Sequence, residues 1–184
     1  KVTPGYKYMF CLHANETLSR MEQTPKLVIA ALNGHAVGGG LEIAMAADIR
    51  IARKDAGKTG LPEINLGVLA GTGGTQRLAR ITGKSKAIEM MVTGNNLSFE
   101  EAKELGIINT LLDGNAADFR RDVLDWAGQF CPPNKAAMAA AHIKRAVQSG
   151  TAVPPESGLA TRRDHPAPPC RPRRAPEGTT TNPR

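Results

Sequence analysis

The sequence predicts an α/β protein in which parallel strands are covered by helices. Residues 26–33 form a short apolar run with β-branched residues that ends at Asn33-Gly34, which is typical of a strand buried on both faces of a parallel sheet. Residues 48–53 alternate isoleucine with arginine, as expected of a strand with one buried face. A glycine-rich segment and a short apolar helix separate the two strands, and this alternation predicts stacked strand–helix units.

The first glycine-rich segment, residues 38–40, precedes a run that is apolar or alanine from Leu41 to Ala47 except for Glu42. Glycine allows a ligand to approach the backbone closely, and a helix start presents unpaired N–H groups with partial positive charge. Negative charge on a substrate oxygen would therefore be stabilised here. The alternative is that the glycines only permit tight helix–strand packing and that Glu42 caps the helix.

A second carboxylate, Glu63, follows Leu61-Pro62 and precedes another glycine-rich helix start. Pro62 fixes its own φ and biases Leu61 toward an extended shape, so Glu63 is held on a defined backbone. The chain then passes Gly67 and Gly71 to reach a predicted helix from residue 73. One Pro-Glu pair carries little information, but two carboxylates that each accompany a glycine-rich helix start form a specific arrangement.

Nucleotide and metal sites are disfavoured by the spacing of the candidate motifs. Gly71-Thr72-Gly73 with Gln76 lacks the third glycine of a dinucleotide fingerprint, and Leu78 stands where a P-loop ending at Ser85 needs glycine. No cysteines and histidines have metal-ligand spacing. The three cysteines lie far apart, and we expect them to be reduced, as in a cytoplasmic protein. We therefore expect no metal and no redox cofactor.

Helical signals continue in the second half of the chain. Ser98 and Glu101 form a capping box, and Gly106 suits the end of that helix. Residues 135–147 are rich in alanine and predict another helix. Between them, one helical face ending before Cys131-Pro132-Pro133 contains Phe119, Val123, Ala127 and Phe130.

Taken together, these landmarks resemble the enoyl-CoA hydratase/isomerase (crotonase) family over residues 5–150, most densely over residues 26–114. The resemblance implies the ClpP/crotonase-like α/β fold, with stacked ββα units and a C-terminal helical region. The landmarks in family order are Phe10-Cys11-Leu12-His13, Ala31-Leu32-Asn33-Gly34, Gly38-Gly39-Gly40, Asp48-Ile49-Arg50, Leu61-Pro62-Glu63, Gly73-Gly74-Thr75-Gln76-Arg77-Leu78, Thr93-Gly94 and the helix from Glu101-Ala102 to Gly106.

The family resemblance also implies a reaction, the hydration of a trans-2-enoyl-CoA to a 3-hydroxyacyl-CoA. In family hydratases two glutamates flank a water molecule, and they correspond to Glu42 and Glu63; we assign water activation to Glu42 and proton donation to Glu63. The oxyanion N–H corresponds to Gly39, within the turn that includes Gly38, and Gly71 corresponds to a water-holding N–H. The presence of both glutamates favours hydration over double-bond isomerisation, which remains the alternative. CoA is part of the acyl-CoA thioester substrate, not a cofactor.

Both ends of the chain depart from the family pattern. Nothing matches the Ala-Gly-Ala-Asp loop that supplies the second oxyanion N–H, and the last residues are rich in proline and arginine. We expect an incomplete crotonase core over residues 1–116, a helical region over 117–150 and a disordered tail over 151–184. The family resemblance implies a homotrimer or a dimer of trimers for the full-length form.

The formal net charge of +7 allows two further interpretations. Residues 162–184 carry six arginines against Asp164 and Glu177, which gives +4 and leaves +3 for the rest. A basic arm that binds nucleic acid on an idle scaffold is one alternative, although few aromatic residues accompany the arginines and nucleic acid is therefore disfavoured. A catalytically idle subunit of an assembly is the other. No apolar run is long enough to span a membrane, and we expect a cytoplasmic location.

Overall fold

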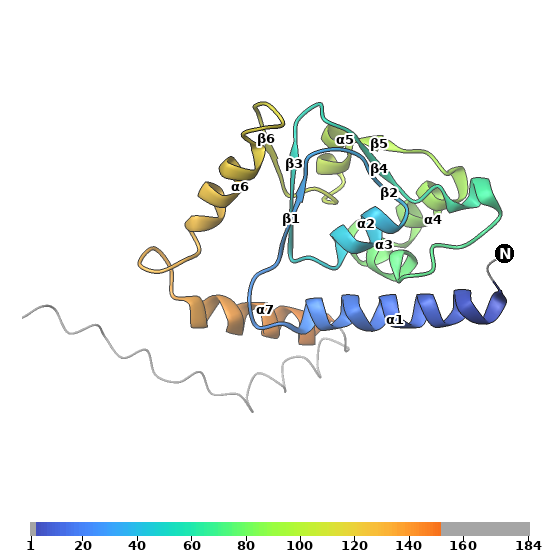
Figure 1. The fold of residues 1–184 in the computed structure, drawn as a ribbon, viewed down its shortest axis with the longest axis horizontal. Coiled ribbons are helices and arrows are strands. Elements are labelled where there is room, and N and C mark those ends of the chain that lie inside the picture. Colours follow the sequence, from blue (N-terminus) through green and yellow to red (C-terminus); the bar gives the residue numbers. More distant parts are fainter. Residues whose placement is uncertain (1–2, 152–184) are drawn as a thin grey trace, which may run out of the picture. The chain divides into compact units, whose positions relative to one another are not determined.

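The computed structural model describes residues 3–151 of the 184-residue chain (Figure 1). The chain divides into two units, residues 1–145 and 146–184, and the fold described below is that of the first. Of the second unit, the described residues 146–151 complete the last helix. The predicted disordered tail, residues 151–184, lies outside the described residues except for Thr151.

Two three-stranded sheets form the framework, and most of their strand pairs are parallel. The first sheet has the order β1-β3-β6, and all its strands are parallel. The second has the order β2-β4-β5, in which β2 and β4 are parallel and β5 is antiparallel to β4. The strands are β1 Ile29–Leu32, β2 Ala36–Val37, β3 Ile49–Arg53, β4 Lys58–Gly60, β5 Leu97–Ser98 and β6 Thr110–Leu112.

The helices begin and end largely where the sequence predicted. The capping box of Ser98 and Glu101 is formed in full, and Gly106, just beyond that helix, has a φ of 75° that suits glycine. The helices are α1 Pro4–Gln23, α2 Gly39–Met45, the 3₁₀ turn η1 Glu63–Leu66, α3 Gly74–Thr82, α4 Lys84–Thr93, α5 Phe99–Glu104, α6 Phe119–Gly128 and α7 Ala137–Thr151 (Figure 1).

The main core lies where α2, α3, α4 and α5 pack together, and its fully buried side chains include Leu41, Leu78 and Phe99. A smaller core joins Ile51 of β3 to Phe119 and Val123 of α6, which confirms that these two positions of the predicted helical face pack inward. The predicted C-terminal helical region thus contributes α6 to the cover of the first sheet.

The prediction that residues 26–33 are buried on both faces was wrong. In β1 the side chains are half-buried, and Ala31 is exposed. Among the described residues, β1 is an edge strand whose one neighbour is β3. An edge strand has a neighbouring strand on one side only, so fewer residues surround its side chains than in the centre of a sheet, whatever its composition.

The prediction of one buried face for residues 48–53 was also wrong, because β3 is the central strand and Arg50, Ile51 and Ala52 are all buried. Burial lowers the pKa of the Arg50 guanidinium, and the charge of Asp48 partly opposes that shift. The guanidinium donates hydrogen bonds to the carbonyl oxygens of Ile107 at 2.5 Å and Ala47 at 2.9 Å. These partners let an arginine occupy a core position that the sequence pattern assigns to solvent.

Candidate functional site

Pairing of β2 with β4 brings the two glutamate motifs together. Val37 lies opposite Gly60 in the parallel ladder, and the N–H of Gly38 donates to the carbonyl oxygen of Gly60 at 2.8 Å. Gly38 then turns into α2, and Gly60 leads directly into Leu61-Pro62-Glu63. Two segments more than twenty residues apart in sequence therefore leave the sheet at the same point.

Glu63 is held beside the start of α2. A Cβ added to Gly38 would lie 3.0 Å from Glu63 Oε1, so the carboxylate occupies the space that a side chain at position 38 would fill. The other carboxylate oxygen, Oε2, is buried, and it is the one buried side-chain nitrogen or oxygen of residues 3–151 without a hydrogen-bond partner. A buried oxygen of this kind costs free energy unless a ligand or a water molecule donates to it, which makes it a candidate for chemistry.

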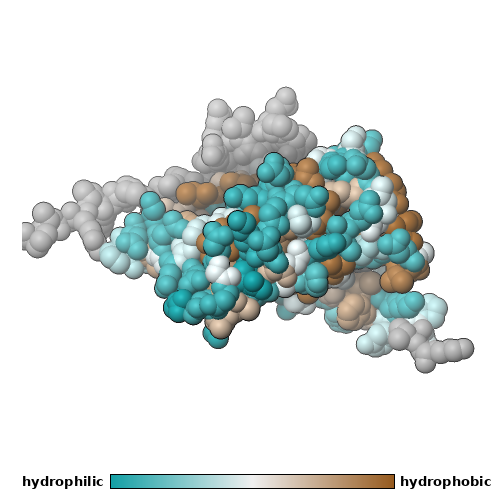
Figure 2. Space-filling view, turned by 90° about the horizontal axis from the view of Figure 1, so that it is seen from above, coloured by the Kyte–Doolittle hydropathy of each residue, from teal (hydrophilic) through white to brown (hydrophobic). Residues whose placement is uncertain are grey.

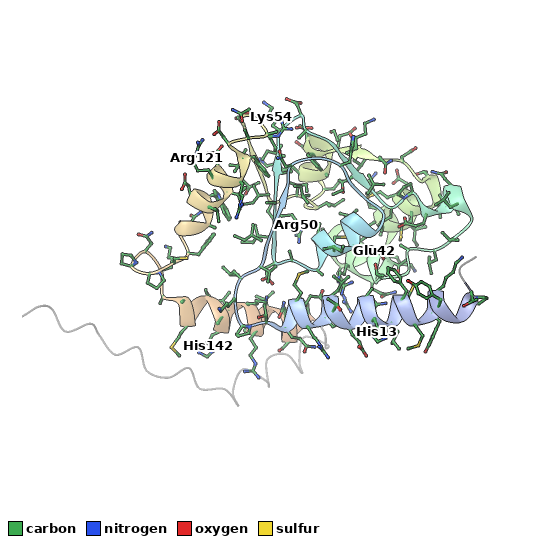
Figure 3. The ribbon with its side chains drawn as sticks, viewed as in Figure 1. His13, Glu42, Arg50, Lys54, Arg121 and His142 are labelled. Carbon is green, nitrogen blue, oxygen red and sulfur yellow. The ribbon has the colours of Figure 1, made fainter. Side chains whose placement is uncertain are left out.

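Glu42, which Figure 3 labels on α2, by contrast accepts hydrogen bonds from three protein donors. Its side chain is buried, and Oε1 accepts hydrogen bonds from the N–H groups of Thr72 and Gly74, each at 2.8 Å. Oε2 accepts the hydroxyl of Thr72. The carboxylate of Glu42 thus binds the N–H of Gly74, which is the first residue of α3. The capping alternative therefore holds for the following helix, not for α2.

The turn that donates to Glu42, residues 71–74, is itself held by α1 and α3. Asn15 on α1 donates to the carbonyl oxygen of Gly71 at 3.1 Å. Arg77 on α3 donates from Nη1 to the carbonyl oxygen of Thr72 at 2.8 Å. Arg77 also forms an ion pair with Glu22 of α1 through Nε and Nη2, at 2.8 and 2.9 Å.

The predicted backbone donors lie at the surface of this site. Gly39 is exposed and is the first residue of α2, so its N–H has no intrahelical acceptor. A Cβ added there would meet nothing within 4 Å. Gly71 is exposed too, but a Cβ on it would lie 3.0 Å from the Sγ of Cys11. The structure connects Gly71 to Glu42 through the adjacent Thr72.

Sequence reasoning missed the residues that fix Glu42 in place. The sequence pattern marks Thr72 and Gly74 only as members of a glycine-rich segment before a helix, and it gives Asn15, Glu22 and Arg77 no role in a site. Asn15 and Gly71 are 56 residues apart, and no local sequence pattern spans that separation. The one available signal was a threonine among glycines directly before a predicted helix.

Apolar side chains are exposed on α1 and on the segment after η1. Figure 2, seen from above, shows brown apolar surface mainly along the right-hand edge of the molecule. The exposed apolar side chains on α1 include Tyr8, Met9 and Phe10, next to Cys11, whose Sγ lies beside Gly71.

Among residues 3–151 no group of three His, Cys, Asp or Glu residues could hold a metal ion. Within the same residues, no helix has both the length and the apolar character needed to cross a bilayer.

Comparison with known proteins identifies the family. The family model described as "Enoyl-CoA hydratase/isomerase" matches residues 6–159. A probable enoyl-CoA hydratase of Bacillus subtilis is 51% identical over 94 residues, which cover 51% of this chain and 36% of the relative. The mitochondrial methylglutaconyl-CoA hydratase of Mus musculus is 40% identical over 154 residues, which cover 82% of this chain and 48% of the relative.

The fold comparison agrees with the sequence comparison. The crystal structure of an enoyl-CoA hydratase from Bacillus anthracis superposes with a TM-score of 0.80 at 31% identity, covering 88% of this chain and 61% of that one. The chain thus spans about half or less of the length of the two curated relatives named above. By the extent of the family match and the shared structure, this chain belongs to the enoyl-CoA hydratase/isomerase family and has the crotonase fold.

Proposed function

We propose that this chain carries the hydratase chemistry of its family, the addition of water to a trans-2-enoyl-CoA to give a 3-hydroxyacyl-CoA. The observation that supports this most directly is the contrast between the two carboxylates. Glu63 has a buried oxygen with no donor, whereas Glu42 is held by three donors from one turn. A hydration needs one group to orient and deprotonate water and another to exchange a proton with carbon.

Glu42 is suited to bind and deprotonate the attacking water molecule. A carboxylate has about four lone-pair positions, and N–H groups can only donate. Three positions are occupied by the two N–H groups and the hydroxyl, and the remaining position can accept a hydrogen bond from one water molecule. This arrangement fixes where the water oxygen would lie before it attacks.

Glu63 is suited to deliver a proton to C2 of the substrate. As the water oxygen bonds to C3 and loses a proton to Glu42, the electron pair of the double bond shifts toward the thioester carbonyl. Glu63, which carries a proton at the start of the reaction, then delivers that proton to C2, and the carbonyl is restored while Glu42 keeps the proton taken from water. Negative charge on the thioester oxygen during these steps would be stabilised by the free N–H of Gly39 at the start of α2. Gly71 would assist in holding the water.

Isomerisation of the double bond is the second candidate function. It requires one carboxylate that removes a proton from one carbon and returns it to another, and the unpartnered oxygen of Glu63 could serve that role alone. The family description covers both activities. Analysis of the product distinguishes them, since hydration gives a 3-hydroxyacyl thioester and isomerisation gives only a moved double bond.

The test is hydration of crotonyl-CoA by the purified chain, followed as the loss of enoyl-thioester absorbance. The matched variants are Glu63→Gln and Glu42→Gln, which keep the side-chain shape and remove the group that gives or takes the proton. Turnover that is lost in both variants would support the proposal. Turnover that survives both substitutions would refute these roles, and no turnover by the unaltered chain would refute hydratase activity for the chain as given.

The proposal extends to the assembly and the compartment. We propose a homotrimer or a dimer of trimers and a cytoplasmic location, with no nucleic acid and no redox cofactor involved. Light scattering after gel filtration would measure the assembly. A nucleic-acid-binding arm, the alternative raised by the arginines of residues 162–184, would instead appear as salt-dependent duplex binding that disappears when those residues are deleted.

A further inference from the structure

Side chains of α1 and α3 hold the turn of residues 71–74, and this turn binds the carboxylate of Glu42. We propose that Thr72, Arg77 and Glu22 are positioning residues: the Glu22–Arg77 ion pair locks the carbonyl of Thr72, and Thr72 in turn locks both oxygens of the Glu42 carboxylate. The catalytic consequence of this lock rests on the proposed hydratase function. The lock itself is a property of the folded chain and can be tested without turnover.

The ion pair with Glu22 fixes the orientation of the Arg77 guanidinium. Arg77 uses Nε and Nη2 for the two oxygens of Glu22 and keeps Nη1 for the carbonyl oxygen of Thr72. Because the guanidinium is planar and rigid, fixing two of its nitrogens also fixes the direction of the third. The Arg77 side chain is 11% exposed and that of Glu22 34%, so the pair is partly withdrawn from water.

The backbone of the turn is shaped around Arg77. Gly73 has a φ of 90°, a conformation that favours glycine, and a Cβ at this position would collide with Nη1 of Arg77. The same Cβ would lie 3.2 Å from Oδ1 of Asn15, whose Nδ2 donates to the carbonyl oxygen of Gly71. Glycine at position 73 is therefore what allows α1 and α3 to reach both sides of the turn.

The lock acts on Glu42 through Thr72. With its carbonyl held by Arg77, the Thr72 peptide has one orientation, and its N–H and hydroxyl lie on opposite oxygens of the same carboxylate. The one free lone-pair position on Glu42 then has a fixed direction. A misplacement of about 1 Å at a reacting group can lower a rate about 100-fold, so the direction matters.

The variants are chosen to separate the hydroxyl from the ion pair. Thr72→Val removes the hydroxyl and keeps the shape and the backbone donors, and Thr72→Ser restores the hydroxyl. Glu22→Gln removes the charge that orients Arg77. Matched controls are Thr93→Val, where an exposed threonine hydroxyl donates only to its own helix, and Glu89→Gln, which breaks the exposed Lys86–Glu89 ion pair.

Two readouts are taken on each variant. The first is the carboxylate stretching band of Glu42, obtained as the infrared difference between each protein and its own Glu42→Gln derivative. We expect a narrow band in the unaltered chain and in Thr72→Ser, and a shifted or broadened band in Thr72→Val and Glu22→Gln. The second is crotonyl-CoA hydration, in which we expect kcat to fall about 10- to 100-fold with KM changed less than about 3-fold.

The outcomes separate the lock from the proposed function. An unchanged Glu42 band in both Thr72→Val and Glu22→Gln overturns the lock, whether or not the chain turns over. A changed band supports it, and where the unaltered chain is active, a kcat that stays at its original value in those variants overturns the positioning role. Absence of turnover in the unaltered chain counts against the hydratase proposal alone. The infrared band of Glu42 in the variants then tests whether Thr72, Arg77 and Glu22 hold its carboxylate.

Discussion

The carboxylate of Glu63 lies against the bare Cα of Gly38, at the place where a Cβ would approach Oε1 to 3.0 Å. Gly38 also has a φ of 58° and donates its N–H to Gly60, the residue that leads toward Glu63. One glycine thus shapes the entrance of α2, ties it to the neighbouring strand and leaves room for the second carboxylate.

Replacing that glycine should affect both stability and activity. For Gly38→Ala we expect a loss of about 1–3 kcal/mol in the free energy of unfolding, because the substituted residue is strained at this φ. Hydration should also fall, since the new Cβ displaces the Glu63 carboxylate. Urea denaturation and the crotonyl-CoA assay measure the two effects. Gly128→Ala is the control, because a Cβ there meets nothing within 4 Å; an equal loss in both variants would contradict the explanation.

The two glutamates should differ in what they contribute to stability. Glu42→Gln replaces an acceptor of three hydrogen bonds and should cost about 1–3 kcal/mol. Glu63→Gln alters a buried oxygen that has no hydrogen-bond partner to lose, so stability should stay the same or increase. Thermal and urea unfolding of the two variants provide the comparison. Equal destabilisation would mean that Glu63 has donors in solution.

Arg50 should stabilise the core through its hydrogen bonds. Arg50→Met leaves the carbonyl oxygens of Ile107 and Ala47 without their donor, and we expect a loss of about 1–3 kcal/mol. Burial lowers the pKa of this base, so its charged form is disfavoured in the fold, and stability would rise with pH only as the pH approached the folded pKa. Over about pH 5 to 9 the loss should be constant. Arg80→Met, at an exposed position, is the control.

Lys144 should connect α7 to the strand framework. Its Nζ forms an ion pair with Asp48 at 2.8 Å and donates to the carbonyl oxygen of Lys26 at 2.9 Å, and its side chain is buried. Lys144→Met removes one partner of a buried ion pair and should lower the free energy of unfolding by about 3–5 kcal/mol. Lys135→Met, at an exposed position just before α7, should have little effect. Similar midpoints of urea denaturation for the two variants would exclude this role.

Glu100 should make stability depend on pH in the acid range. The N–H of Asp55 donates to Glu100 Oε1 at 3.0 Å, and this hydrogen bond lowers the pKa of the carboxyl below its usual 4.5. A depressed folded pKa contributes stability above the unfolded pKa, and that contribution is lost as the pH falls through the folded value. In Glu100→Gln the decline of the melting temperature below pH 4.5 should be shallower than in the unaltered chain. An identical decline would show that other carboxylates account for it.

Sequence alone determined the local elements and indicated Glu42 and Glu63 as candidate site residues. The capping box at Ser98, the helix stop at Gly106 and the glycine-rich entrances of α2 and α3 follow from contacts between residues a few positions apart, which a pattern in the chain can report. The family landmarks fall on these same elements, so the fold could be predicted from them.

Only the tertiary structure decided which side chains are buried and which distant residues they contact. Sequence could not give β1 its edge position, place Arg50 in the core or bring Thr72 and Gly74 to Glu42, because each depends on which distant segment lies alongside. Only the pairing of β2 with β4 brings the two glutamate motifs to one point, and only the packing of α1 on the turn of residues 71–74 supplies Asn15 and Glu22. Such contacts form between surfaces that exist only once the chain has folded, so a local sequence pattern cannot predict them.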